Sequence, residues 1–279
     1  MSTPPSAEPR PSPWEIVQLA RHPQRPKLDD YLEALFTEVT ELHGDRLFGD
    51  DPALFCGLAR FEGDPVAVIG HRKGRQTKEN LERRWGMPNP EGFRKAVRVM
   101  RLAEKRSLPV VSFVDTPAAY PGIEAEERGQ AEAIARAILT MTRLRTPIAV
   151  VITGEGGSGG ALGIGVGDRI LMMAYAIYSV IPPEGCAAIL WRDAARKEEA
   201  ADALKITAWD LQQLGVVDEV IPEPPGGAHE DPPQAFAAVR EALRRTLRTL
   251  RAVPIDELLA RRYAKYRSLG RFAEGTDEP

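Results

Sequence analysis

Two patterns of apolar positions alternate along the chain: short continuous runs, and residues three or four positions apart. This alternation of strand-like and helix-like segments predicts an α/β protein. The short apolar runs at 110–114, broken only by Ser112, and at 148–152 are typical of strands that are buried on both faces. Between these runs, Ile134, Ile138 and Met141 recur at helical spacing and mark one face of a long helix. Strands that alternate with helices in this way favour a sheet with parallel pairing.

The same patterns predict the remaining elements of the fold. Helices are expected at 28–43, 90–106, 183–191, 233–251 and 255–268, and further strands at 53–61, 65–69, 169–173, 176–181 and 216–221. Only Glu62, Gly63 and Asp64 separate the first two strands, a spacing that predicts a hairpin-like connection. Thr207 and Asp210 stand three residues apart, as in a capping box at the start of a helix.

Changes in composition divide the chain into four parts. Residues 1–13 contain five prolines and few apolar groups, so a disordered leader is expected there. An N-terminal helical segment is expected at 14–52, the main α/β domain at 53–251, and a C-terminal helix with a tail at 252–279. The apolar share of 43% is sufficient for a sizeable core.

Charge and cysteine content narrow the class of protein. A net charge of −3 lacks the basic excess of a nucleic-acid-binding protein. Cys56 and Cys186 have no CxxC partners, so we expect two buried thiols and neither a zinc knuckle nor a disulfide framework. Neither a signal-peptide core nor a run of about 18 apolar residues is present, so the protein is expected in the cytoplasm and away from membranes.

The strongest candidate for chemistry is the glycine-rich segment 154–167, which follows an apolar strand and opens a short helix. Glycine lets the backbone approach a ligand closely, and unpaired N–H groups at a helix start attract negative charge. The segment therefore predicts a site that binds an anion or stabilises an oxyanion that forms during a reaction. Close packing of a helix on the sheet is the alternative explanation for such small residues.

Three functional templates fit this segment. Gly154, Gly156 and Gly159 match the spacing of a dinucleotide-binding turn, but no acidic residue ends the next strand. Ser158 matches a hydrolase nucleophile elbow, with His229 downstream in a flexible-looking, solvated loop. The third template is an oxyanion hole built from backbone N–H groups alone, which requires no nucleophile.

Two further segments carry candidate binding residues. The loop Asp115-Thr-Pro-Ala-Ala-Tyr-Pro-Gly122 follows a buried strand, so it is expected at the same edge as the glycine turn and as the opposite wall of one pocket. The stretch 70–80 is strongly basic but lacks a phosphate-binding P-loop. It is either a solvated surface or a docking patch for the phosphates of coenzyme A or for an acidic carrier protein.

Eight motifs between Arg21 and His229 occur in a family-specific order, within a resemblance that covers roughly residues 15–270. They are Arg21-His-Pro-Gln-Arg-Pro26, Gly70-His-x-Lys-Gly-Arg-x-Thr-Lys-Glu79, Gly86-Met-Pro-x-Pro-Glu-Gly92, Asp115-Thr-Pro-x-Ala-Tyr-Pro-Gly122, Ala125-Glu-Glu-Arg-Gly-Gln130, Gly154-Glu-Gly-Gly-Ser-Gly-Gly-Ala161, Ser179-Val-Ile-x-Pro-Glu-Gly-Cys186 and Ile221-Pro-Glu-Pro-x-Gly-Gly-Ala-His229. This series resembles the carboxyltransferase α-subunit family of bacterial acetyl-CoA carboxylases. Each motif alone is modest, whereas eight in this order are specific.

The resemblance implies a crotonase-like (ClpP/crotonase) α/β fold, a spiral of ββα units, at 53–251. It implies transfer of CO2 from carboxybiotin on the biotin carboxyl carrier protein to acetyl-CoA, which gives malonyl-CoA for fatty acid synthesis. The implied partners are a zinc-carrying β subunit in an α2β2 complex, the carrier protein and biotin carboxylase. No tightly bound cofactor or metal is expected on this chain.

The resemblance also assigns residues. It implies that Gly159 and Gly160 hold the ureido oxygen of biotin, and we expect substrate contacts from Gly157, Ala118, Ala119, Tyr120, Lys73 and Arg75. The family normally has glycine at position 118, so Ala118 is expected to narrow the pocket or to strain the backbone if that position needs positive φ. The family often has a longer helical N-terminal arm than the proline-rich leader here. A Clp-like serine hydrolase that uses Ser158, and a non-catalytic scaffold for the β subunit, are the competing functions.

Overall fold

The computed structural model describes residues 10–270 of the chain. Positions 1–9 of the expected disordered leader lie outside the described residues, as do positions 271–279 of the expected tail. Pro13 of that leader is already the first residue of helix α1 (Pro13–Ala20), which Ser12 caps by accepting a hydrogen bond from the Glu15 amide. Within residues 10–270, no helix is both long and apolar enough to cross a membrane.

The helix expected at 28–43 is wrong in its second half. Helix α2 (Leu28–Leu35) ends early, and the chain continues as strand β1 (Phe36–Glu41), which pairs antiparallel with the next strand. Aromatic and β-branched residues such as Phe36 and Val39 favour a strand where a sheet edge is available to pair with. Val39 is 40% exposed on this strand, although the helical pattern placed it on the buried stripe.

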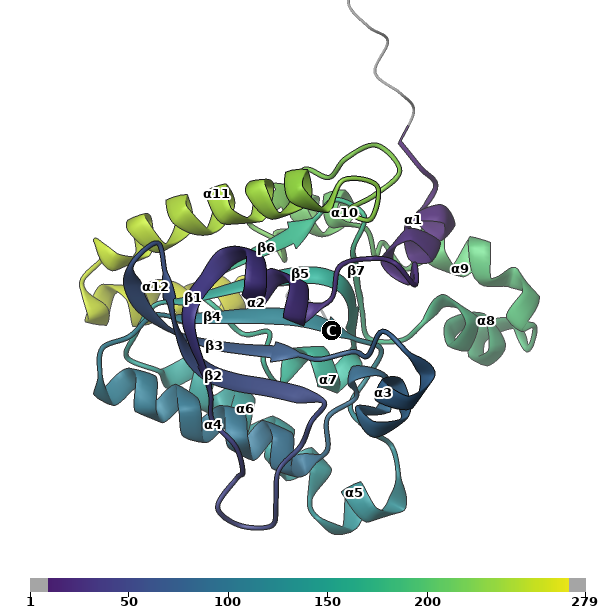
Figure 1. The fold of residues 1–279 in the computed structure, drawn as a ribbon. Coiled ribbons are helices and arrows are strands. Elements are labelled where there is room, and N and C mark those ends of the chain that lie inside the picture. Colours follow the sequence, from purple (N-terminus) through teal and green to yellow (C-terminus); the bar gives the residue numbers. More distant parts are fainter. Residues whose placement is uncertain (1–9, 271–279) are drawn as a thin grey trace, which may run out of the picture.

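One mixed sheet forms the centre of the molecule (Figure 1). Its further strands are β2 (Leu54–Phe61), β3 (Asp64–His71), β4 (Val110–Thr116), β5 (Ile148–Gly157), β6 (Arg169–Met173), β7 (Ile177–Ser179) and β8 (Glu219–Ile221). The order is β1-β2-β3-β4-β5-β6-β8, with β7 paired to β5 outside this path. The expected β2–β3 hairpin is confirmed, and all pairings from β3 onward are parallel as expected.

Helices cover both faces of this sheet. Those after α2 are α3 (Thr77–Glu82), α4 (Pro90–Lys105), α5 (Ile123–Glu127), α6 (Gln130–Arg143), α7 (Ser158–Leu162), α8 (Pro183–Trp191), α9 (Lys197–Ala203), α10 (Ala208–Gln213), α11 (Pro232–Arg251) and α12 (Ile255–Arg267). Helices α4 and α6 pack side by side on one face, and α2 and α11 lie on the other (Figure 1). Thr207 caps α10 as expected, and both cysteines are buried free thiols.

The parallel strands bring three segments to one edge of the sheet. In the β4–β5 register Thr116 lies opposite Gly156, and β3 ends at His71 beside β4. The basic segment, the loop after β4 and helix α7 therefore all begin at the same edge. This arrangement confirms that the glycine turn and the 116–122 loop emerge together.

A buried arginine attaches the C-terminal helix α12 to the rest of the fold. The Arg262 guanidinium forms an ion pair with Asp168 at 2.7 Å and donates to the carbonyl oxygens of Met141, Leu144 and Thr146 at 2.7–2.9 Å. Its side chain has no exposed surface. The loop that follows α6 and the start of β6 are thus tied to α12 by one side chain.

We predict that Arg262→Met lowers the free energy of unfolding by about 3–5 kcal/mol, because it leaves the buried carboxylate of Asp168 without a counter-charge. Arg261→Ala is the matched control, since Arg261 is 64% exposed and, among residues 10–270, pairs only with Glu257 on the same helix. The control should change the free energy by less than about 0.5 kcal/mol. Urea unfolding measures both values, and equal losses would contradict the anchoring role of Arg262.

Candidate functional site

The glycine turn joins β5 to α7 and lies against the loop that follows β4. A Cβ atom on Gly160 would come within 2.5 Å of the Ala118 carbonyl oxygen and of the Ala119 nitrogen. A Cβ atom on Gly157 would overlap with the Pro117 carbonyl oxygen. Glycine is therefore required at positions 157 and 160, because the backbone there packs directly on the backbone of the neighbouring loop and leaves no room for a side chain.

Gly159 has different surroundings from its two neighbours. A Cβ atom there would meet only the Ile134 side chain, at 3.4 Å, which is an ordinary van der Waals distance. Gly159 also lines the main cavity beside α7. Because Gly159 and Gly160 lie in the first turn of α7, their N–H groups have no carbonyl partner within that helix.

His71 fixes the position of this helix start. Its Nε2 lies 3.2 Å from the Gly160 carbonyl oxygen, and its Nδ1 accepts a hydrogen bond from the Asp115 amide at 3.4 Å. These partners assign the neutral form with the proton on Nε2. Burial lowers the pKa of His71 to about 3, so the ring stays neutral near pH 7. One imidazole thus links the ends of β3 and β4 to α7.

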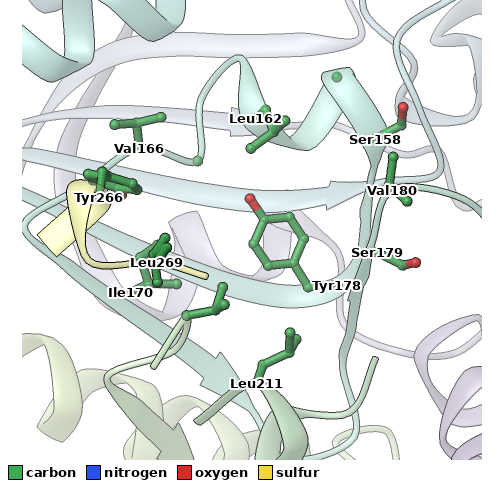
Figure 2. A pocket seen from close by; sticks show the side chains of 13 residues that line it. Ser158, Leu162, Val166, Ile170, Tyr178, Ser179, Val180, Leu211, Tyr266 and Leu269 are labelled. Carbon is green, nitrogen blue, oxygen red and sulfur yellow. The ribbon is translucent and has the colours of Figure 1, made fainter. Parts of the chain in front are cut away.

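A cavity of about 440 Å³ lies beside α7, as shown in Figure 2. Its walls are mainly apolar, formed by side chains that include Leu162, Val166, Ile170, Leu211 and Val216. Helix α12 and the chain after it close one side with Tyr266 and Leu269. Such an apolar hollow with a few polar groups at its border is typical of a small-molecule site.

Tyr178 is the polar side chain in the middle of this cavity. Its ring lies at the centre of Figure 2, and its hydroxyl has no hydrogen-bond partner within residues 10–270. Burial raises the pKa of Tyr178 to about 12, so the hydroxyl remains a donor near pH 7. The sequence analysis missed this residue, although Tyr178 directly precedes the motif that begins at Ser179.

Alternating charges connect the strand ends behind the turn. The order is Glu184, Arg21, Glu155, Lys73 and Asp115, with successive ion pairs at 2.6–2.9 Å. Although burial opposes the charged forms, the two carboxylates beside Lys73 raise its pKa, and Lys73 lowers theirs. This line of charges holds α1, α8 and the ends of β3, β4 and β5 together.

The structure places the expected binding residues in three different settings. Lys73 belongs to the line of charges, and Arg75 is 63% exposed and pairs with Asp30. Ala118, Ala119 and Tyr120 belong to the loop packed on the turn, and none of them lines the cavity. The two loops therefore touch each other, and Pro117 lines a small cavity of about 30 Å³ together with Gly156 and Gly157, so the expectation of one shared pocket is confirmed there. The 115–122 loop does not line the main cavity. The close fit of Gly157 and Gly160 is the reason.

The alanine that replaces the family glycine causes no backbone strain. Ala118 does not adopt positive φ. Its carbonyl oxygen accepts a hydrogen bond from the Thr116 hydroxyl at 2.7 Å, and its amide donates to the same hydroxyl at 3.3 Å. The expected strain at this position is thus absent, and since Ala118 does not line the main cavity, it does not narrow it.

The side chains around Ser158 do not support a serine hydrolase, although its backbone has the positive φ, 50°, of a strained strand-to-helix turn. The Ser158 hydroxyl is directed away from Tyr178 in Figure 2, and it has no hydrogen-bond partner within residues 10–270. The expectation that His229 is solvated is wrong: its ring stacks on His22 at 3.7 Å, and its side chain is 8% exposed. The loop is ordered because Glu223 accepts the Ala228 amide and pairs with a buried arginine.

Comparisons with known proteins agree with the motif series. The family model described as "Acetyl co-enzyme A carboxylase carboxyltransferase-like" matches residues 10–270. The chain is 60% identical over 262 residues to the acetyl-coenzyme A carboxylase carboxyl transferase subunit alpha of Geobacter sulfurreducens, covering 94% of this chain and 82% of the relative. It is 56% identical over 264 residues to the protein of the same name from Thioalkalivibrio sulfidiphilus, covering 95% and 83%.

Solved structures with low sequence identity share the fold. A transcarboxylase 12S structure with methylmalonyl-coenzyme A bound matches with a TM-score of 0.67 at 16% identity, over 98% of this chain and 49% of that one. The chain thus spans about half of the transcarboxylase chain. A Pseudomonas malonate decarboxylase hetero-tetramer in complex with coenzyme A matches with a TM-score of 0.65 at 18% identity, over 85% and 95%. These similarities confirm the expected crotonase-like α/β fold.

The contrast between the two candidate oxyanion glycines gives a stability prediction. Gly160→Ala should destabilise the protein by about 1–3 kcal/mol, because the new methyl group must displace the backbone of the 117–119 loop. Gly159→Ala should be neutral or stabilising by up to about 1 kcal/mol, since the space is open and alanine favours the helix. Urea unfolding of both variants measures the difference. Similar values would mean that the turn does not depend on this contact.

Proposed function

Because the chain belongs to the acetyl co-enzyme A carboxylase carboxyltransferase-like family, we propose that it transfers CO2 from carboxybiotin to acetyl-CoA as the α-type subunit of a carboxyltransferase. The observation that carries this proposal is the close similarity, over nearly the whole chain, to proteins named as that subunit. The product of the reaction is malonyl-CoA. We place the reaction in the cytoplasm.

The described residues suit the biotin half of this reaction. When carboxybiotin loses CO2, negative charge develops on the ureido oxygen, and the N–H groups of Gly159 and Gly160 are the proposed donors to it. One donor of this kind lowers a barrier by about 3–4 kcal/mol in oxyanion holes. The apolar walls beside Gly159 suit a neutral bicyclic ring, and the Tyr178 hydroxyl is a further donor to a polar atom of that ring.

No side-chain base from this chain is needed in the proposed reaction. The C–N bond to the carboxyl group breaks, the acetyl methyl carbon forms the new C–C bond, and the methyl proton goes to the ureido group left behind. The unpartnered hydroxyl of Ser158 therefore has no covalent role. A reaction without a side-chain base or nucleophile agrees with the lack of a nucleophile–base pair around Ser158 in the described residues.

The remaining parts of the reaction are assigned to other chains. We propose that a β subunit binds acetyl-CoA, supplies the oxyanion hole for its enolate and carries zinc, within an α2β2 complex. Biotin reaches the site on its carrier protein after biotin carboxylase has acted. Lys73 is held by Asp115 and Glu155, so its proposed role is to position the turn. Arg75 is 63% exposed in its pair with Asp30, and it is the proposed contact for an anionic substrate or carrier. Gly157, Ala118, Ala119 and Tyr120 support the same turn from the other side.

The first test is reconstitution of the reaction. We predict malonyl-CoA formation from carboxybiotin and acetyl-CoA when the chain is mixed with the β subunit, and none with the chain alone. A coupled spectrophotometric assay of malonyl-CoA measures the rate. Full activity of the isolated chain would contradict the division of roles, and no activity of the mixture would contradict the function.

A matched pair of variants separates the oxyanion hole from a serine nucleophile. Gly159→Val should lower kcat by about 10²–10³ while the complex still assembles, because its side chain blocks access to the N–H group. Ser158→Ala should retain most of the activity. Loss of activity in Ser158→Ala alone would favour the hydrolase, and wild-type rates in Gly159→Val would favour a scaffold.

Tyr178→Phe tests the cavity as the place where biotin binds. We predict a KM for free carboxybiotin that is roughly tenfold higher, because one hydrogen bond to the ring is lost, with little change in kcat. The KM for acetyl-CoA should not change, since that substrate is assigned to the partner. Equal KM values for carboxybiotin in the variant and the wild type would exclude Tyr178 from binding.

A further inference from the structure

The loop at 44–50 exposes two adjacent apolar side chains. Leu47 is 78% exposed and Phe48 is 65% exposed, which places both among the most exposed large apolar residues of residues 10–270. The loop projects from the sheet between β1 and β2 in Figure 1. Exposed apolar pairs of this kind are unfavourable in water unless something covers them.

Buried charges hold this loop in one conformation. The Asp45 carboxylate accepts the amides of Leu47, Phe48 and Gly49 at 2.8–3.0 Å and pairs with Arg94 at 2.7 Å. Although burial opposes ionisation, these donors lower the pKa of Asp45 to about 2. The carboxylate is therefore charged, and fully engaged, near pH 7.

A second buried ion pair fixes the end of the loop. The ammonium of Lys95 has no exposed surface and donates to Asp50 at 2.6 Å and to the Asp51 carbonyl oxygen at 2.8 Å. Arg128 lies over the Phe48 ring at 4.6 Å and is itself held by two hydrogen bonds to Glu91. The loop is thus ordered before any partner binds, which lowers the entropy cost of association.

The charge around the apolar pair indicates the kind of partner. Arg46 and Arg98 donate only to the backbone carbonyl oxygens of His43 and Gly44, and within residues 10–270 neither has a carboxylate partner. A second copy bound through a two-fold axis would bring the same positive charges to the contact, and the carboxylates of its loop, Asp45 and Asp50, are already paired within their own chain. The chemistry fits a different chain with an apolar pocket bordered by carboxylates.

The position of the loop relates it to the candidate site. The loop leads into β2, and Leu54 at the start of β2 lies opposite His71 at the end of β3. The loop therefore enters the sheet at the edge where α7 begins, and His71 contacts α7 directly. A chain bound there lies along the edge that carries the reaction.

We propose that the 44–50 loop is a docking element for the second carboxyltransferase subunit, with Leu47 and Phe48 as its apolar anchors. This inference rests on the proposed function, which requires such a subunit. Two adjacent apolar anchors at the centre of an interface, surrounded by charge, are typical of binding hot spots. Arg46 and Arg98 contribute to the rate of association by attracting the acidic border.

The test is the double variant Leu47→Ser/Phe48→Ser in the full chain. We expect its Kd for the β subunit to rise about tenfold or more, measured by surface plasmon resonance, with an unchanged melting temperature. Tyr263→Ser is the matched control, because Tyr263 is also a large and exposed side chain, at 62%, and it lies on α12, far from the 44–50 loop in the sequence. Arg46→Glu should slow association and reduce its dependence on salt.

The outcomes separate this inference from the proposed function. If the wild-type chain and the β subunit form an active complex and the double variant binds with the same Kd, the docking role is wrong and the function stands. If the double variant loses only self-association, measured by light scattering, the loop joins copies of this chain and the inference is wrong. If the wild-type chain does not bind the β subunit, the proposed function fails as well.

Discussion

Backbone-to-backbone packing between the glycine turn and the 117–119 loop determines where the candidate site lies. Gly157 and Gly160 leave no room for a side chain against Pro117 and Ala118. Because α7 is closed on that side, its open side is the one that faces the apolar cavity. The position of the cavity beside Gly159, and with it the proposed assignment of the site to biotin, depends on this contact.

Charged groups hold the elements that make this contact possible. Lys73 bridges Asp115 and Glu155, which stand at the ends of neighbouring parallel strands. His71 adds a hydrogen bond from the third strand end to the first turn of α7. Lys73 is the cationic residue of the basic 70–80 segment that lies next to the site, and its charge is therefore already paired within the protein. Within residues 10–270, Arg46 and Arg98 at the 44–50 loop have no carboxylate partner and are accessible to other chains, whereas Arg75 pairs with Asp30.

In the proposed function, the site formed in this way is half of a reaction centre. It offers backbone donors, an apolar cavity and one phenol, but within residues 10–270 no nucleophile–base pair accompanies them. Such a site stabilises charge on one substrate and leaves the second substrate to another chain. In our proposal, the ordered apolar loop at 44–50 is the place where that chain binds. The fold thus combines charge stabilisation and subunit contact along a single edge.

The sequence by itself determined the buried strands, most helices, the motif family and the edge of the sheet where the two loops emerge. These features follow from short-range periodicity and from residues that are neighbours in the chain. It could not determine that Phe36 begins a strand, since that depends on pairing with β2. Nor could it show that Lys73 is paired with two carboxylates, or that Tyr178 enters the cavity. Those facts depend on contacts between residues far apart in the chain. Only the tertiary structure brings such residues together. It also distinguishes two neighbouring glycines that look alike in the sequence: Gly160 is packed against backbone, whereas Gly159 has open space around it.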